Sequence, residues 1–244
     1  MTGWLRIVGL GPGADVMITP QVREALADAS DVYGYATYVK RIAPRAGLVV
    51  HPSDNREELT RARAALAATA AGRRVVIVSS GDPGVFAMGA AVFEAMEDNE
   101  HWQRLDVAVL PGVTAMLAAA AAAGAPLGHD FCAINLSDNL KPWRLIEKRL
   151  ALAVEADFAI AIYNPRSKSR PETFNAALDV IARAGGADRL VILVRNAGLP
   201  DQVVMSGPLN EIDVDSIDMR TLVIVGSSAT TRVGRWVYTP RRAS

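Results

Sequence analysis

Short β-rich runs alternate with longer helical patterns along the first half of the chain, an order typical of α/β proteins. Strands are expected at residues 4–10, 32–35, 48–51, 74–79 and 105–110. Thr19 and Pro20 predict the start of one helix, because these residues are favoured at the N-cap and the first helical position. Asp54 and Glu57 predict a capping-box start for a longer helix that ends at Gly72. The first half therefore predicts a largely parallel sheet.

In the second half, the helical patterns stop well before the β-rich runs do. Strands are expected at residues 130–136, 158–163 and 190–194, with helices at 142–156 and 171–184. Three further runs at 202–206, 221–225 and 236–238 read as strands joined by turns, which predicts a mixed sheet. A helix of small residues at 115–123 is broken by Gly124, so we expect two α/β domains, at 1–124 and 125–244.

Composition narrows the classes of function. The 26 basic and 26 acidic residues balance, which argues against broad electrostatic binding to nucleic acid. Only four basic residues are lysines, and the dominant arginines fit either a polyanionic substrate or a coding bias. Cys132 is the single cysteine, which excludes an intrachain disulfide and a four-cysteine zinc site, and no metal site is expected. The sequence lacks a signal-peptide pattern and a run long enough to span a bilayer, so we expect a cytoplasmic protein without membrane contact.

A glycine-rich motif, Gly9-Leu10-Gly11-Pro12-Gly13, follows the first predicted strand. It is not a dinucleotide-binding fingerprint, because the third glycine would fall at Ala14. It is not a Walker loop either, since no Gly-Lys-Ser/Thr follows. The motif is explained equally well by a tight turn and by a ligand.

The motif at residues 79–89, Ser-Ser-Gly-Asp-Pro-Gly-Val-Phe-Ala-Met-Gly, is more informative because it follows a buried strand directly. Its glycines let a ligand approach the backbone, and Asp82 either caps the next helix or faces an ammonium or sulfonium group. Three other predicted strands also end in small or polar residues, at 111–115, 163–165 and 195–198. Ligands of α/β sheets bind at the carboxyl ends of strands. These five strand ends therefore predict a cleft between the two halves, lined mostly by backbone.

Taken in order, the strings VGLGPG, SSGDPGVFAMG, LPGVTA, YNP and RNAG resemble the tetrapyrrole methyltransferases of cobalamin and siroheme biosynthesis. The resemblance covers nearly the whole chain. It implies a two-domain α/β fold distinct from the Rossmann-like methyltransferases, an active-site cleft between the domains, and S-adenosylmethionine as the cofactor. The strings IYNPRSKSRP, VRNAG and WVYTPR are most similar to the branch that methylates C-17 of the macrocycle and contracts the ring.

The resemblance also implies which residues contact the ligands, many of them through backbone groups. The expected cofactor contacts are Pro12, Gly81, Asp82, Val85, Phe86, Thr114, Ala115, Tyr163, Asn164, Asn196 and Ala197. The substrate would be a tetrapyrrole with many carboxylates. Its expected contacts are Gly11, Arg166, Lys168 and Arg170, although the three basic residues also fit a solvated turn.

Methyl transfer is an in-line displacement that disperses charge, so positioning matters more than a strong acid. Contraction of the macrocycle requires proton movements, for which a general acid or base is useful. The expected catalytic candidates are Asp82, His129 and Asp15, and each also has a structural interpretation. His129, for example, fits a surface position in the linker between the domains. Asp82 is favoured for a cofactor contact rather than for proton transfer.

Several alternatives remain open on the sequence. Another member of the family would act at a different carbon or on a cobalt-containing intermediate, and an enzyme of the same fold would methylate RNA or a protein histidine. A non-catalytic nucleotide-sensing module is an alternative of a different class, while the glycine spacing disfavours an NAD-dependent enzyme. The resemblance also implies a homodimer. The aromatic residues Tyr33, Tyr35, Tyr38, Trp236 and Tyr238 fit either its interface or the core.

Overall fold

The computed structural model describes residues 3–54 and 56–242. The chain divides into two compact units, Met1–Ala115 (unit 1) and Met116–Ser244 (unit 2). This division precedes most of helix α6 (Ala115–Ala123), whereas the sequence suggests a boundary after it. The helix joins unit 2 because the Met116 N–H donates to the Tyr163 hydroxyl at 3.1 Å, and because Gly124 pairs with strand β13. Within the described residues, no helix has the length and apolar composition that a membrane span requires.

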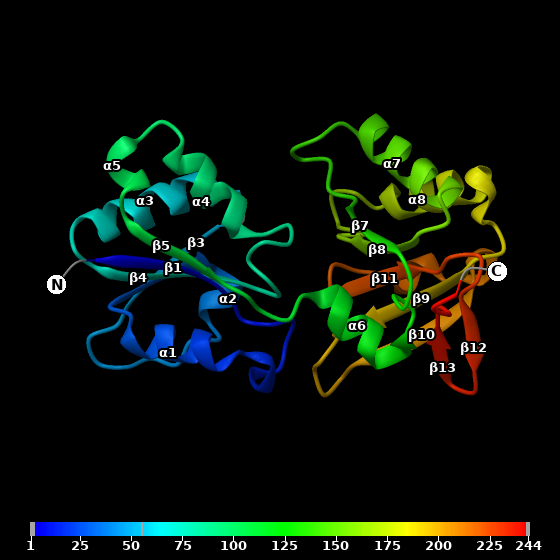
Figure 1. Cartoon of the computed structure of the whole chain (residues 1–244), viewed down its shortest axis with the longest axis horizontal. Helices are drawn as coiled ribbons and strands as arrows, with labels where there is room; N and C mark the ends of the chain where they lie inside the picture. Colours follow the sequence, from blue (N-terminus) through cyan, green and yellow to red (C-terminus); the bar gives the residue numbers. More distant parts are fainter. Residues whose placement is uncertain (1–2, 55, 243–244) are drawn as a thin grey trace. The chain divides into compact units, whose positions relative to one another are not determined.

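Unit 1 contains a five-stranded sheet in the order β3-β2-β4-β1-β5, with every pair parallel (Figure 1). The strands are β1 (Trp4–Gly9), β2 (Asp31–Tyr35), β3 (Val49–Ser53), β4 (Arg74–Ser79) and β5 (Asp106–Leu110). The predicted strands and their parallel arrangement are confirmed. The central strand β4 is buried along nearly all of its length, as a parallel strand covered on both faces should be.

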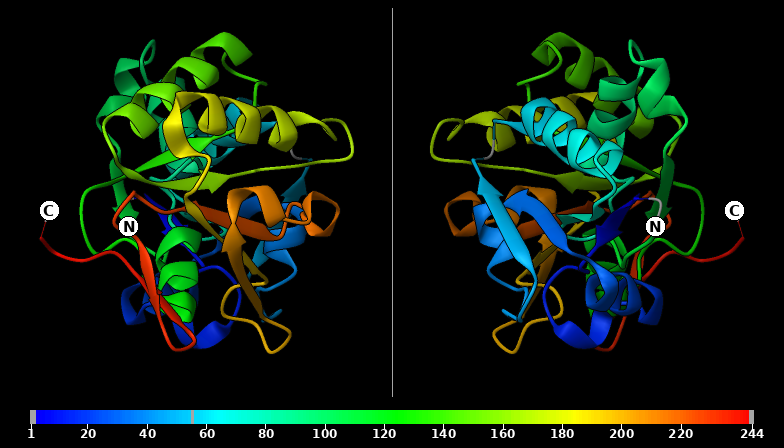
Figure 2. Two further views of the ribbon diagram at one scale, coloured as in Figure 1. Left: turned by 90° about the vertical axis from the view of Figure 1, so that its right-hand side faces the viewer. Right: turned by 90° about the vertical axis from the view of Figure 1, so that its left-hand side faces the viewer.

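Helices cover both faces of this sheet, with α3 and α4 on one side and α1 on the other (Figure 2). The helices are α1 (Pro20–Asp28), α2 (Ala36–Val39), α3 (Glu58–Ala70), α4 (Met88–Met96) and α5 (Glu100–Gln103), with a 3₁₀ turn η1 (Asp15–Met17). The predicted cap at Thr19 is present, whereas α3 begins at Glu58 and its N-cap residue is Glu57, which makes no side-chain cap hydrogen bond, rather than the predicted Asp54. Thr19 Oγ1 accepts from the Val22 N–H at 3.3 Å, and the Glu57 carboxylate accepts from the Asp54 N–H at 3.1 Å. Gly72 ends α3 with a left-handed φ of 84°.

Unit 2 contains a mixed five-stranded sheet in the order β10-β9-β11-β8-β7, in which only β7 and β8 run parallel. Its strands are β7 (Phe131–Asn135), β8 (Ala159–Tyr163), β9 (Leu190–Arg195), β10 (Val203–Pro208) and β11 (Thr221–Val225). A second, three-stranded sheet has the order β12-β13-β6, made by β6 (Gly124–Ala125), β12 (Thr231–Val233) and β13 (Trp236–Tyr238). The predicted mixed sheet is confirmed, whereas β6 and β12 were not predicted because both are short and lack an apolar run.

Two further helices of unit 2, which follow α6, pack on its larger sheet. They are α7 (Trp143–Glu155) and α8 (Thr173–Ile181), with a π-helical turn η2 (Ala182–Gly186) and 3₁₀ turns η3 (Leu209–Glu211) and η4 (Val214–Ser216). The fully buried Phe174 and Leu150 lie in one apolar cluster with Ile160 of β8. Each unit thus has its own core.

Candidate functional site

We call the loop that follows the C-terminal end of a strand its exit. The exits of β4, β1 and β5 lie side by side, because these three strands are neighbours in the unit 1 sheet. Gly11 and Gly81 join the first two exits through a pair of backbone hydrogen bonds. The Gly11 N–H donates to the Gly81 carbonyl at 3.2 Å, and the Gly81 N–H donates to the Gly11 carbonyl at 2.9 Å. Both glycines have left-handed φ values, 67° and 65°. The two glycine-rich motifs of the sequence therefore form one backbone-bonded structure.

Positions 9 and 112 require glycine, because the backbone of each residue lies directly against the backbone of Gly81. A Cβ atom built on either residue would lie 2.3 Å from the Gly81 carbonyl oxygen. Gly89 is similarly constrained, since its Cβ would lie 2.7 Å from the Pro83 carbonyl oxygen. Gly84 is exposed, and the nearest atom to a Cβ there would be a side-chain oxygen of Asp82 at 3.2 Å. Most glycines of these exits thus serve loop packing, whereas Gly84 lies in a more open position.

Asp82 holds two strand exits together. Its Oδ1 accepts from the Gly84 N–H at 2.8 Å, and its Oδ2 accepts from the Gly112 N–H at 2.9 Å. One charge-assisted hydrogen bond of the carboxylate therefore stabilises the β4 exit, and the other links this exit to the β5 exit. The suggestion that Asp82 caps the next helix is wrong, because α4 begins at Met88 and its N-cap, Ala87, makes no side-chain cap hydrogen bond.

Arg41, which the sequence did not single out, supports the first exit. Its guanidinium donates to the Leu10 carbonyl at 2.7 Å and to the Gly11 carbonyl at 3.1 Å. Burial lowers the pKa of Arg41, an effect that the nearby Asp15 carboxylate opposes. Asp15 lies 3.9 Å from the guanidinium, in the exposed turn η1. No local pattern could have revealed Arg41, since α1, β2 and α2 lie between it and the motif that it supports.

The remaining predicted residues of unit 1 line the same exits. Thr114 is buried, whereas Pro12, Val85 and Ala115 are half-buried. Phe86 is 48% exposed and has a φ of 53°. The structure thus gathers the predicted unit 1 residues around three neighbouring strand ends, as expected.

In unit 2, asparagine side chains organise the strand exits. Asn164 and Asn196 directly follow β8 and β9 and have left-handed φ values of 52° and 53°. The Asn164 side-chain amide donates to Asn135 Oδ1 at 3.0 Å, which joins the exits of the adjacent strands β8 and β7. The Asn196 amide donates to Asp201 Oδ2 at 2.7 Å. Next to it Ala197 is buried.

The basic residues proposed for the substrate differ in their surroundings. Arg166 donates to the Val214 carbonyl at 2.8 Å and to Asp215 at 2.9 Å. Arg170 donates to the Leu136 carbonyl at 3.1 Å, next to the β7 exit. Lys168 is exposed. Arg166 and Arg170 therefore already have protein partners, and Arg170 supports the loops that follow the strands.

The three catalytic candidates are divided between the two units. Asp15 and Asp82 belong to unit 1. His129 belongs to unit 2, in the loop before β7, where it lies 3.7 Å from Asp130. Asn135, at the other end of β7, pairs with Tyr163, so the whole length of β7, about 13 Å, separates His129 from these exits. Within unit 2, His129 is therefore remote from the predicted cofactor contacts.

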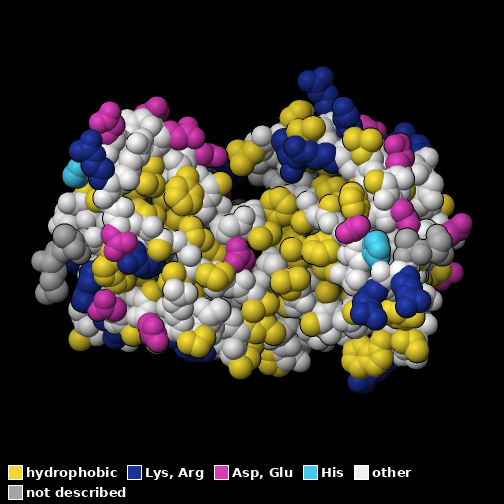
Figure 3. Space-filling model, in the orientation of Figure 1, with side chains coloured by type: hydrophobic (Ala, Val, Ile, Leu, Met, Phe, Trp, Pro, Cys, Tyr) yellow, Lys and Arg dark blue, Asp and Glu magenta, His cyan; other side chains and the backbone are white. Residues whose placement is uncertain are grey.

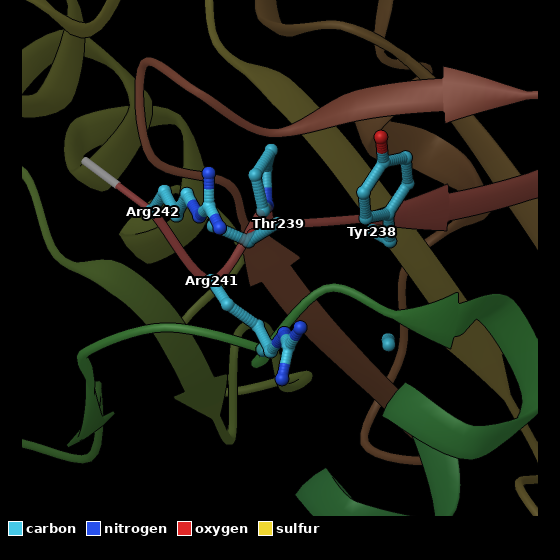
Figure 4. A pocket seen from close by; sticks show the side chains of 7 residues that line it. Tyr238, Thr239, Arg241 and Arg242 are labelled. Carbon is cyan, nitrogen blue, oxygen red and sulfur yellow. The ribbon is translucent and has the colours of Figure 1, made fainter. Parts of the chain in front are cut away.

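A surface pocket of about 560 Å³ lies beside the last strand of unit 2 (Figure 4). It is lined by Ala125, Gly128, Tyr238, Thr239, Pro240, Arg241 and Arg242. The Thr239 hydroxyl donates to the Pro126 carbonyl at 2.6 Å, which holds the strand on the loop after β6. The lining includes none of the predicted cofactor or substrate residues.

Comparisons with known proteins agree with the motifs. The family model for tetrapyrrole (corrin/porphyrin) methylases matches residues 5–213. The chain is 51% identical to a precorrin-3B C(17)-methyltransferase of Sinorhizobium sp, over 99% of this chain and 97% of that one. It is 40% identical to a probable cobalt-factor III C(17)-methyltransferase of Salmonella typhimurium, over 97% of this chain and 98% of that one. The crystal structure of the methyltransferase CobJ superposes with a TM-score of 0.95 and 56% identity, covering 98% of this chain and 100% of that one.

Proposed function

Because the chain belongs to the tetrapyrrole (corrin/porphyrin) methylase family, we propose that it methylates precorrin-3B at C-17 and contracts the ring to precorrin-4, in cobalamin biosynthesis. The observation that carries the proposal is the 51% identity to the Sinorhizobium enzyme over nearly the full length of both chains. A cobalt-containing substrate is the second candidate, supported by the lower, 40% identity to the Salmonella protein.

The proposed cofactor is S-adenosylmethionine, which when bound supplies an electrophilic methyl group on a sulfonium. The unit 1 exits fit such a molecule, because they offer backbone groups, small side chains and one carboxylate, Asp82, already held by two N–H donors. The proposed contacts in unit 1 are Pro12, Gly81, Asp82, Val85, Phe86, Thr114 and Ala115. Those proposed in unit 2 are Tyr163, Asn164, Asn196 and Ala197.

The chain's own contribution to this chemistry is positioning. A near-attack geometry supplies roughly 7–11 kcal/mol of a displacement barrier, and it requires loops that do not move. Asp82 bonds two exits together, the Gly11–Gly81 pair joins two, and Arg41 holds the first. We assign Asp82 to holding the cofactor loops.

Proton movements during ring contraction require a different group. Asp15 stays a candidate for that role, since it is exposed beside the first exit. His129 is the weaker candidate, because it lies at the opposite end of β7 from the unit 2 exits. The proposed substrate contacts are Gly11 and Lys168, with Arg166 and Arg170 shaping the loops around them.

We further propose that the protein acts in the cytoplasm as a homodimer. Trp236 and Tyr238 support the dimer, because they are 42% and 37% exposed on β13. Figure 3 shows apolar and basic side chains gathered near this hairpin. Tyr33 and Tyr38 pack against the unit 1 core instead. Light scattering after size exclusion tests the dimer, and a monomeric mass would refute it.

The deciding experiment is incubation with precorrin-3B and methyl-labelled S-adenosylmethionine, followed by carbon NMR of the product. Label at C-17 in a contracted ring is the expected result. Label at another carbon would reject the specific activity and keep the family. A parallel incubation with the cobalt-containing intermediate separates the two candidate substrates, and faster turnover of that intermediate would favour the second. Calorimetry with S-adenosylhomocysteine checks the cofactor independently of the substrate.

A further inference from the structure

Arg61 is a buried cation near the start of helix α3, and its side chain is only 5% exposed. Its guanidinium makes three hydrogen bonds to neutral acceptors. Nε donates to Ser53 Oγ at 2.6 Å, Nη2 donates to the Asp54 carbonyl at 2.6 Å, and Nη1 donates to Met88 Sδ at 3.1 Å. These contacts fix the guanidinium between the exit of β3 and the first residue of α4.

The charge of Arg61 has no close counter-ion in unit 1. Within the described residues, its side-chain partners include no carboxylate. Burial lowers the pKa of Arg61, and the more distant Glu58 and Glu57 oppose this only in part. A guanidinium carries five N–H groups, so two of them have no acceptor among the described residues. Because an unpaired buried charge is costly, Arg61 is well suited to bind an anion.

A surface pocket of about 180 Å³ lies beside this guanidinium. Its lining includes Arg61, the Thr60 hydroxyl, the exposed Ala64 and the exposed Glu57. The volume corresponds to about six water molecules at roughly 30 Å³ each, which suits a carboxylate on a short carbon chain but not a macrocycle. Glu57 opposes an anion from the solvent side, where water and salt screen its charge, whereas Arg61 acts from a buried position.

The pocket lies at the same edge of the unit 1 sheet as the proposed cofactor loops. Strand β2 runs parallel to both β3 and β4, so the exits of β3 and β4 are both at the carboxyl edge. The order β3-β2-β4 places these exits two strand spacings apart, about 10 Å. A macrocycle with carboxylates around its rim can span this distance, with a ring carbon at the β4 exit and one carboxylate at Arg61.

We propose that this pocket is a subsite for one peripheral carboxylate of the tetrapyrrole substrate, with Arg61 as its anchor. The inference rests on the proposed function and adds the residue that sets how the macrocycle is turned. The carboxylate accepts from the two remaining N–H groups of Arg61 and from the Thr60 hydroxyl, and contacts to a guanidinium are charge-assisted. Holding one rim group decides which ring carbon faces the methyl donor, so Arg61 determines specificity.

The pocket can be filled without removing a contact of Arg61. Ala64→Leu places a larger side chain in the pocket. Ala67→Leu is the matched control, because Ala67 is exposed about one turn later on α3 and is not among the residues that line the pocket. Quenching of tryptophan fluorescence measures binding of precorrin-3B, and calorimetry measures binding of S-adenosylhomocysteine.

We expect Ala64→Leu to weaken precorrin-3B binding roughly tenfold, the loss of one hydrogen-bonded charged contact, and Ala67→Leu to leave it unchanged. Affinity for S-adenosylhomocysteine should stay within about twofold in both variants, because the cofactor loops are intact. Carbon NMR of the methylated product should show part of the label away from C-17 in Ala64→Leu only. A purely structural effect on α3 would not redirect the label.

Two further variants test the charge. Arg61→Lys keeps the positive charge without the planar fork and should weaken precorrin-3B binding roughly threefold to tenfold, with Tm reporting whether the protein stays folded. Glu57→Gln removes the opposing carboxylate from an exposed position and should strengthen precorrin-3B binding by about twofold. Weaker binding in Glu57→Gln would show that the pocket favours a cation and would overturn the subsite.

Unchanged precorrin-3B binding in Ala64→Leu, or equal losses in Ala64→Leu and Ala67→Leu, would also overturn it. Binding of succinate or inorganic phosphate that is lost in Ala64→Leu, with precorrin-3B binding unchanged, would assign the pocket to a free anion instead. Failure of the proposed function is distinguishable. A wild type that binds precorrin-3B but forms no C-17 product refutes that function alone, whereas absence of tetrapyrrole binding refutes both.

Discussion

The strand exits of the two units are built in different ways. In unit 1, glycines bring backbone against backbone, and Gly9 and Gly112 both pack on the Gly81 carbonyl. In unit 2, asparagines adopt the left-handed conformation and their side-chain amides join neighbouring loops, as Asn164 does with Asn135. The contacts of Gly9 and Gly112 leave no room for a side chain, whereas the Asn164 contact depends on one hydrogen bond that a substitution can remove. The two units should therefore respond very differently to small substitutions.

The largest effect is expected from Gly112→Ala. The new Cβ would lie 2.3 Å from a backbone oxygen that no rotamer change can move. We expect a loss of about 3 kcal/mol in the free energy of unfolding, because overpacking against backbone forces the loop to shift. Urea denaturation measures this, and S-adenosylhomocysteine affinity should fall with it. Gly207→Ala is the matched control, since a Cβ there meets nothing within 4 Å. Equal stability of the two variants would contradict the close contact between the exits.

Asp82→Ala should have the next largest effect. It removes the hydrogen bond to Gly84 within the β4 exit and the hydrogen bond to Gly112 that joins the β4 and β5 exits. We expect a loss of about 2 kcal/mol in the free energy of unfolding. Asp82→Asn retains one acceptor oxygen and should recover part of the stability and of the cofactor affinity. If Asp82→Ala keeps wild-type stability but loses S-adenosylhomocysteine binding, Asp82 acts on the cofactor directly rather than through the loops.

Asn164 tests the other half of the comparison. Asn164→Ala loses the hydrogen bond to Asn135 and leaves a Cβ in the left-handed region, which should cost about 1–2 kcal/mol. Asn164→Gly loses the same hydrogen bond but relieves the backbone, so it should be the more stable of the two. Thermal unfolding of both variants is the measurement. A glycine variant as damaging as the alanine one would show that backbone conformation does not limit this exit.

The smallest effect concerns acid stability. Burial raises the pKa of Asp31, but hydrogen bonds from Arg73, His51 and Ser30 outweigh it and hold that pKa below its ordinary value of 3.8. The carboxylate lies 2.7 Å from the Arg73 guanidinium and 3.0 Å from the His51 ring. Because the folded pKa is depressed, this stabilisation is present above about pH 4 and is lost as pH falls through the folded value.

Asp31→Asn should therefore reduce the loss of unfolding free energy that unit 1 shows as the pH falls below about 4. Asp157 in unit 2 is the comparison. Burial raises its pKa, but Ser228 and Arg189, with His129 nearby, lower it overall. Asp157→Asn should likewise reduce the loss of unfolding free energy of unit 2 at acid pH. Urea midpoints between about pH 3 and 6 measure both variants. If the pH dependence of the urea midpoint is unchanged in either variant, that carboxylate does not contribute to acid stability.

Sequence patterns predicted the regular elements well where local signals were strong. The buried strand β4 appears as expected, and helix α3 is present but begins later than the expected start at Asp54. The short elements α2, α5, β6 and β12 were missed, because so few residues show no periodicity. Strand β6 exists only because Gly124 and Ala125 pair with β13 more than a hundred residues later. Such pairing has no local signature.

The glycine-rich motifs show the same division. Their residue types and their place after strands, with the family resemblance they carry, are determined by the sequence alone. Only the tertiary structure decided that Gly9 and Gly112 serve contact with Gly81, that Asp82 bonds to Gly112, and that Arg41 holds Leu10. The physical reason is that local propensities act between neighbours in the chain. Close packing and hydrogen bonding instead act between residues that only the folded sheet brings together.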